Sequence, residues 1–205
     1  QTHVTLFSFI NLRVIRKVLF DWIKLNIAFR KINFKKNFPL LDDFDLKDYY
    51  RNDFLDSFIG QTSIDNLLML NLFNEAFKKL DEKNKVTYLL ENQGWEIAML
   101  SVCKSFNLNK VIGFSHASTR FWDLRLFYDR KEYFNFNNLK LPLPDCLAVN
   151  SNNAFETYVN MGYPKNNIKN VESLRHLYLN GLLKNKKQII KKKFFTILIL
   201  GDYVE

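Results

Sequence analysis

Three side chains that can accept or hold a proton come after two short apolar runs of the sequence. Glu91 directly follows residues 86–90, Glu96 lies five positions later, and His116 closely follows residues 111–114. A carboxylate or an imidazole acts as a general base when it is held within hydrogen-bond reach of the proton that it removes. These three residues are therefore the candidate catalytic groups.

The segments around them predict how they are positioned. Residues 86–90 and 111–114 are short and β-favouring, which is typical of buried strands, and residues 95–106 have apolar side chains at helical spacing. A strand, a helix and a strand with short connections predict a βαβ unit and hence a parallel sheet. Ligands of open parallel sheets bind beyond the carboxyl ends of the strands. We therefore expect Glu91 and His116 to lie side by side at that edge.

The same alternation continues on both sides of this unit. We expect a helix over 63–80 capped by Ser63, a third strand over 146–150, and a helix with Asn153 as its N-cap and Glu156 completing a capping box. Gly162 is expected to end that helix. A fourth strand is expected over 168–174 and another over 194–200. The predicted fold class is α/β, a Rossmann-like parallel sheet flanked by helices.

Residues 6–34 predict a long N-terminal helix. One face of it carries apolar residues, and the opposite face carries cations (Ile15, Val18, Trp22, Leu25, Phe29 and Ile32; Arg13, Lys17, Lys24 and Lys31). Two interpretations stay open, namely packing within the protein and peripheral contact with an anionic membrane surface. Phe20, Ile23 and Ile27 lie towards the charged face, which favours packing.

The composition narrows the classes of function. The net charge of +9 is concentrated in residues 13–36, with eight basic residues and Asp21, and in residues 184–193, with six lysines and no acid. This pattern lacks the basic and aromatic stripe of a nucleic-acid-binding surface, so no nucleic acid partner is expected. The two cysteines, Cys103 and Cys146, are expected to be buried and reduced. No apolar run is long enough to span a membrane.

No metal or resident cofactor is expected. The six aspartates of residues 42–56 lack the spacing and the central glycine of a calcium loop, so this acidic stretch is interpreted as a solvated connection. The sequence also has neither a GxGxxG pattern nor a P-loop.

Candidate substrate-binding residues lie outside the two strand ends. Arg120 and Arg125 suit phosphate or carboxylate recognition, with Asp123 between them as an alternative ion-pair partner. Arg175 and His176 follow the fourth predicted strand, where they either reach a donor or are simply exposed. Trp95 either stacks on a sugar ring or belongs to the core. For Glu91, Glu96 and His116 the alternatives are a helix-capping carboxylate, a carboxylate complementing the helix dipole, and a loop histidine bound to backbone.

Several motifs in one order resemble the bacterial surface carbohydrate biosynthesis family of O-antigen gene regions. The likeness covers roughly residues 53–179, and one departure is Ala117, where a hydroxyl residue is expected after the histidine. The motifs are Glu91-Asn-Gln-Gly-Trp-Glu96, Gly113-Phe-Ser-His116, Arg120-Phe-Trp-Asp-Leu-Arg125, Leu141-Pro-Leu-Pro-Asp145, Ala148-Val-Asn-Ser151, Gly162-Tyr-Pro164 and Val171-Glu-Ser-Leu-Arg175.

The resemblance implies a glycosyltransferase with two facing Rossmann-like domains (the GT-B arrangement). The expected organisation is an amphipathic helical segment over 1–40, an acceptor-side domain over 41–182, a lysine-rich linker over 183–193 and the first strand of a donor-side domain over 194–205. The chain is thus expected to be part of a longer cytoplasmic protein, peripheral at the membrane or free of it. Its partners would be a nucleotide sugar and a glycan or lipid-linked acceptor.

Two rival functions stay open beside the transferase. One is a sugar-nucleotide epimerase on the same scaffold, which needs no acceptor. The other is a non-catalytic, membrane-docking assembly protein that uses the basic helix and the linker.

Overall fold

The computed structural model describes residues 3–32, 47–81, 83–116 and 141–172, together with residues 178, 179 and 181. The chain divides into two units, Gln1–Val171 and Glu172–Glu205, and every helix and strand described below belongs to the first. Among the described residues, no helix is both long and apolar enough to cross a membrane.

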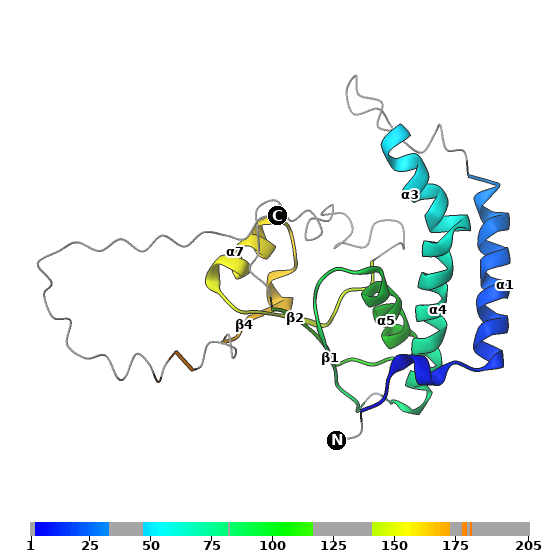
Figure 1. Cartoon of the computed structure of the whole chain (residues 1–205). Helices are drawn as coiled ribbons and strands as arrows, with labels where there is room; N and C mark the ends of the chain where they lie inside the picture. The colour runs from blue at the N-terminus through cyan, green and yellow to red at the C-terminus, as the bar shows by residue number, and fades with distance from the viewer. Residues whose placement is uncertain are drawn as a thin grey trace, which may run out of the picture. The chain divides into compact units, whose positions relative to one another are not determined.

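Four parallel strands form the centre of this unit (Figure 1). They are β1 (Val86–Leu89), β2 (Val111–Ser115), β3 (Cys146–Val149) and β4 (Ile168–Asn170), and they pair in the order in which they occur in the chain. The register places Leu89 beside Phe114, and Phe114 beside Ala148. All four carboxyl ends therefore lie at one edge of the sheet, and the prediction of an α/β fold with a parallel sheet is confirmed.

Two helices cover one face of this sheet. Helix α5 (Gly94–Ser105) connects β1 to β2, and α7 (Asn152–Asn160) connects β3 to β4. Buried side chains of α5 pack with Tyr88 and Val111, whereas those of α7 pack with β3 and β4. Both predicted helices and the strands β1, β2 and β3 are confirmed within one or two residues. The fourth strand begins at Ile168 as predicted, but β4 ends at Asn170 and not at residue 174.

Three further helices form a layer beside α5. Helix α4 (Gln61–Ala76) contacts α5 as well as α1 (Leu12–Phe29) and α3 (Lys47–Ile59), so it lies between them (Figure 1). One side of α4 packs Phe73 into the core beneath α5, and another side packs Leu72 against α1. An apolar helix with neighbours on several sides is expected to be buried in this way. Short 3₁₀ helices lie at Leu6–Phe9, Phe77–Lys79 and Lys165–Asn167.

The N-terminal helix begins later than the sequence predicts. The 3₁₀ turn Leu6–Phe9 precedes α1, and Asn11 caps α1 by accepting a hydrogen bond from the backbone N–H of Val14 at 3.0 Å. An asparagine at this position satisfies one of the unpaired N–H groups of the first turn. The predicted single helix over 6–34 is therefore wrong at its start and at its end, because α1 ends at Phe29 and residues 30–32 are not helical.

The acidic stretch is also different from its prediction. Residues from Lys47 to Ile59 form helix α3 rather than a solvated connection. Phe54 and Phe58 pack against each other and against Phe29 of α1, with ring centroids 4.9–5.9 Å apart. Aromatic packing on a neighbouring helix thus stabilises α3, although its sequence lacks the amphipathic spacing that would predict a helix. Asp42, Asp43 and Asp45 lie outside the described residues.

Two predicted helix caps are displaced. Gly60, not Ser63, occupies the N-cap position of α4, and the hydroxyl of the buried Ser63 donates to the Gly60 carbonyl at 2.7 Å. Ser151, not Asn153, caps α7 by accepting a hydrogen bond from the N–H of Ala154 at 3.1 Å. The helix stop at Gly162 is confirmed, because this residue has φ 94°, a conformation that favours glycine.

Candidate functional site

Glu91 and His116 are brought together at the carboxyl edge of the sheet. The backbone N–H of Leu90 donates to the Phe114 carbonyl at 2.8 Å, which extends the pairing of β1 and β2 up to the two residues. Oε1 of Glu91 lies 3.6 Å from Nε2 of His116, and the two side chains are 47% and 35% exposed. The predicted meeting of these residues at neighbouring strand ends is therefore observed, in a position that solvent reaches.

A third strand end contributes Asn150, which the sequence reasoning missed as a site residue. It follows β3, and its Nδ2 donates to the backbone carbonyl of His116 at 3.3 Å. Its position one residue beyond an apolar strand is the same signal that pointed to Glu91. Nδ1 of His116 is buried, and among the described residues it has no hydrogen-bond partner. Asn150 thus fixes the backbone that carries the imidazole ring.

Glu96 holds the turn from which Glu91 projects. Its Oε1 accepts hydrogen bonds from the backbone N–H groups of Glu91 at 2.8 Å and Gln93 at 3.1 Å. Glu96 is only 2% exposed, and it lies in the first turn of α5, where a carboxylate complements the helix dipole. Asn92, between the two glutamates, has φ 56°, a conformation that asparagine tolerates better than most residues. These contacts favour a positioning role for Glu96 over the predicted catalytic one.

A small cavity lies beneath this turn. Its volume is about 30 Å³, and its lining includes Tyr88, Leu90, Asn92, Glu96 and Tyr158. Oε2 of Glu96 is buried, and among the described residues it has no hydrogen-bond partner. Pockets for small molecules span about 300–1,000 Å³, whereas a water needs roughly 10–15 Å³. The cavity therefore has room for water beside the carboxylate but not for a sugar or a nucleotide.

Trp95 belongs to the core. The Trp95 ring is stacked with the ring of Phe73 of α4, with centroids 6.4 Å apart. It packs edge-to-face with the ring of Tyr88 of β1, with centroids 6.3 Å apart. It is partly buried and packs against the core cluster between α4, α5 and the sheet. Of the two interpretations of Trp95, its surroundings support the core residue and not the sugar-stacking one.

Asp145 aligns the opposite edge of the sheet. Its Oδ2 accepts a hydrogen bond from the backbone N–H of Val111 at 2.8 Å, which ties the start of β3 to the start of β2. The motif Leu141-Pro-Leu-Pro-Asp145 thus helps to set the relative height of the two strands. His116 and Asn150 directly follow β2 and β3, so the alignment of these two strands determines where both residues lie.

The remaining candidate residues fall outside the described part of the chain. These are Arg120, Asp123, Arg125, Arg175 and His176, and the same holds for the predicted linker over 183–193 and the strand over 194–200. Within the described ranges, no group of three or more His, Cys, Asp or Glu side chains is arranged to hold a metal ion.

Comparisons of the chain with known protein families, with curated proteins and with solved structures found no match.

Proposed function

We propose that this chain forms the acceptor-side domain of a glycosyltransferase of surface polysaccharide assembly, in which Glu91 and His116 activate the acceptor hydroxyl. The observation that carries the proposal is the 3.6 Å approach of Glu91 Oε1 to His116 Nε2 at the carboxyl ends of two neighbouring parallel strands. Ligands of open parallel sheets bind at this edge. The motif resemblance to surface carbohydrate biosynthesis proteins supplies the reaction class.

The chemistry fits a carboxylate–imidazole pair. In a direct displacement, the base removes the proton of the acceptor hydroxyl while the hydroxyl oxygen forms its bond to the anomeric carbon of the donor. The bond from that carbon to the nucleotide diphosphate breaks, and the diphosphate leaves with the electron pair. Glu91 is the more exposed of the two side chains and serves as the base, and His116 orients its carboxylate.

Charge on the departing diphosphate needs cations or aimed dipoles. Arg120, Arg125, Arg175 and His176 are the residues that the sequence offers for this role. Asn150 and Glu96 are positioning residues, because they hold the backbone of His116 and the turn of Glu91 in place.

The test is sugar transfer by the full-length protein carrying Glu91→Gln or His116→Ala. Removal of a general base lowers kcat by about 10²–10⁴-fold, so we expect Glu91→Gln to fall in that range and His116→Ala to lose at least tenfold. Glu75→Gln is the matched control, because Glu75 is a partly exposed carboxylate near the end of α4 that pairs with Lys78 at 2.5 Å. Unchanged rates in both site variants would reject the assignment.

The donor is identified first, by calorimetric titration with a panel of nucleotide sugars and free nucleotides. Selective binding of one nucleotide names the donor for an acceptor screen. Conversion of the free sugar nucleotide without any acceptor would instead establish an epimerase. A folded protein that binds no member of the panel would contradict both enzyme classes.

A further inference from the structure

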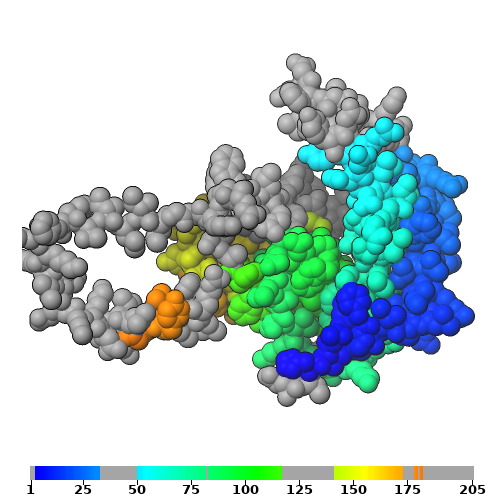
Figure 2. All heavy atoms as spheres, in the orientation of Figure 1, coloured from blue at the N-terminus to red at the C-terminus, as the bar shows by residue number. Residues whose placement is uncertain are grey.

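The outward face of α1 is apolar, and no other described element covers it. Six large apolar side chains along the helix are 46–61% exposed: Leu12, Ile15, Leu19, Phe20, Ile23 and Ile27. The preceding segment adds Val4, Phe7 and Ile10, which are 63%, 54% and 45% exposed. Figure 2 draws these N-terminal segments in blue at the surface of the molecule. Single exposed apolar residues are ordinary, but a continuous stripe of them marks an interaction surface.

This stripe is not the face that holds α1 to the protein. Val14 and Val18 are 3% and 7% exposed and pack with Leu72 of α4. At 100° per residue, they lie roughly 100–180° around the helix from Leu19 and Ile23. The sequence pattern predicts Ile15 on the buried face, but this residue is 46% exposed. The apolar surface of α1 is therefore wide enough that one part packs on α4 and another part is directed outward.

Cations border the outward stripe. Arg16 lies within it, and Arg13, Lys17 and Lys24 lie along one side, as the helical angles place them. The ammonium group of Lys24 rests 4.3 Å from the ring centroid of Phe20. A shallow surface hollow is lined by Leu12, Arg13, Arg16, Lys17 and Phe20, so three cations and two apolar side chains meet there.

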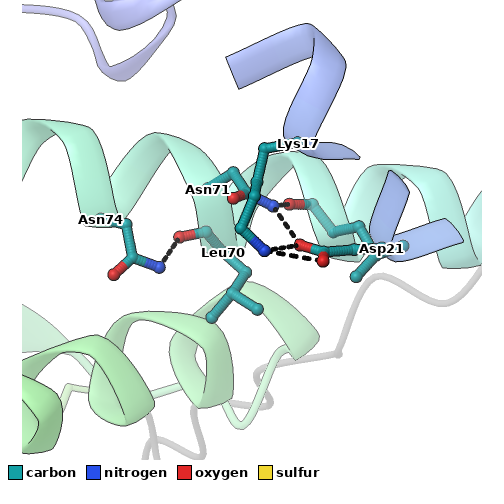
Figure 3. A network of polar contacts seen from close by, with 6 residues as sticks. Lys17, Asp21, Leu70, Asn71 and Asn74 are labelled. Carbon is teal, nitrogen blue, oxygen red and sulfur yellow. Dashed lines mark hydrogen bonds and ion pairs between the residues drawn. The ribbon is translucent and has the colours of Figure 1, made fainter. Parts of the chain in front are cut away.

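Helix α1 has one acidic residue, and of these cations it pairs with Lys17. Asp21 pairs with Lys17 at 2.7 Å and accepts a hydrogen bond from Nδ2 of Asn71 of α4 at 3.4 Å (Figure 3). Within the described part of the chain, Arg13, Arg16 and Lys24 take part in no ion pair. The outward face thus combines exposed apolar side chains with uncompensated positive charge.

We propose that this face of α1 docks the protein on an anionic membrane surface. An interfacial helix places its apolar side chains at the boundary between headgroups and acyl chains, while Lys and Arg at its rim contact anionic headgroups. A second copy of the chain fits less well, because a two-fold interface places the same patch against itself and would bring the basic rims together. The charge therefore selects an anionic partner, and the convex apolar helix suits a lipid surface.

The test is co-sedimentation of the full-length protein with vesicles of phosphatidylcholine alone and of phosphatidylcholine mixed with phosphatidylglycerol. We expect binding to the mixed vesicles that weakens as salt is raised. Each basic residue near the surface contributes about a fivefold change in partitioning. The triple variant Arg13→Gln, Arg16→Gln, Lys24→Gln should therefore lose about a hundredfold in affinity for the mixed vesicles.

The apolar contribution is tested by the double variant Leu19→Asp, Ile23→Asp. It should abolish vesicle binding and leave thermal unfolding unchanged, because both side chains are more than half exposed. The matched control is Ile64→Asp on α4, a side chain that is 37% exposed and lies outside the stripe, and which should bind like the unchanged protein. Donor binding measured by calorimetry should be the same in all variants, so the outcome is independent of the proposed enzymatic function.

Three results would overturn the proposal. One is no binding to either vesicle by a folded protein, as expected if another part of the protein covers the stripe. The second is equal binding to neutral and anionic vesicles. The third is concentration-dependent self-association that Leu19→Asp, Ile23→Asp abolishes, which would assign the face to a second copy.

Discussion

Glu91 and Glu96 are the same residue type five positions apart, and their surroundings give them different roles. Glu91 is about half exposed and approaches an imidazole, so it can meet a substrate and exchange a proton. Glu96 is buried and its Oε1 accepts two backbone hydrogen bonds, so it fixes the turn between strand and helix. Replacing a buried carboxylate that satisfies backbone groups leaves those groups unpaired. Glu96 is therefore needed for the geometry of the site without having to touch the substrate.

The sequence predicted the meeting of Glu91 and His116 because both follow apolar runs of a βαβ pattern. It did not predict Asn150 as the residue that holds the His116 backbone, although the same strand-end rule applies to it. An amide side chain after a strand has many uses, such as turns and caps, so residue type alone gave no reason to select it. The packing of the partly buried Trp95 depends on Phe73 and Tyr88, which come from two other elements, so no local pattern reveals it.

The two cysteines should differ strongly in reactivity. Burial, and then the negative charge of Asp145, raise the pKa of the Cys103 thiol to about 11 from an ordinary value of 9.0. The thiolate is the reactive form, so its population at a given pH below 9 falls about a hundredfold. Cys146 is half-buried. Under native conditions we expect an aromatic disulfide reagent to modify one thiol rapidly and the second only after unfolding.

The variants Cys146→Ser and Cys103→Ser assign the two phases. In folded Cys146→Ser the fast phase should disappear, and in Cys103→Ser it should persist. Equal rates for both thiols in the folded protein would contradict the burial of Cys103.

At the scale of elements, the strongly periodic or apolar segments were predicted correctly, and the segments without a period were not. The strands β1–β4 and the helices α5 and α7 follow from short apolar runs and helical spacing. Helix α3 has no such pattern, and its stability comes from aromatic contacts with α1 that lie far away in the sequence. Helix caps were misplaced by two or three residues because more than one acceptable N-cap residue stands near these two helix starts: Gly60 and Ser63 at α4, and Ser151 and Asn153 at α7.

The N-cap of α7 gives a direct test at this scale. Ser151→Ala removes the hydroxyl that accepts the N–H of Ala154, and loss of such a cap costs about 1 kcal/mol in the free energy of unfolding. Asn153 lies inside the first turn and is exposed, so Asn153→Ala should be neutral or slightly stabilising, because alanine is the better helix former. Urea unfolding followed by circular dichroism measures both. If Asn153→Ala lowered the free energy of unfolding more than Ser151→Ala, Asn153 and not Ser151 would be the N-cap.

At the scale of the whole unit, the sequence predicted the parallel sheet but not the layer of helices beside it. The N-terminal helix was interpreted with one apolar and one charged face, whereas α1 uses Val14 and Val18 for packing and leaves a second apolar stripe exposed. The apolar residues of α1 form one wide arc around the helix, with Arg13, Lys17 and Lys24 on the remaining side, so periodicity could not decide which part of the arc is buried. The position of α4 between α1 and α5 decides it.

This arrangement makes α4 the link between the N-terminal helices and the sheet. Leu72 is fully buried and packs with Val14 and Val18, while the neighbouring Phe73 packs into the core beneath α5. Truncation of a buried leucine removes its apolar contacts and leaves a cavity, which costs about 2–5 kcal/mol. We therefore expect Leu72→Ala to lower the free energy of unfolding by that amount.

The matched substitution Ile64→Ala removes a similar volume from the exposed side of the same helix, where the side chain is 37% exposed, and should cost well under half as much. If α1 and the sheet unfold together, circular dichroism and tryptophan fluorescence give one coincident urea transition, which Leu72→Ala shifts as a whole. Two separated transitions, with only the first one moved by Leu72→Ala, would mean that α1 is held to α4 as an independent element. In that case the outward stripe of α1 would contact the membrane on a helix that can separate from the sheet.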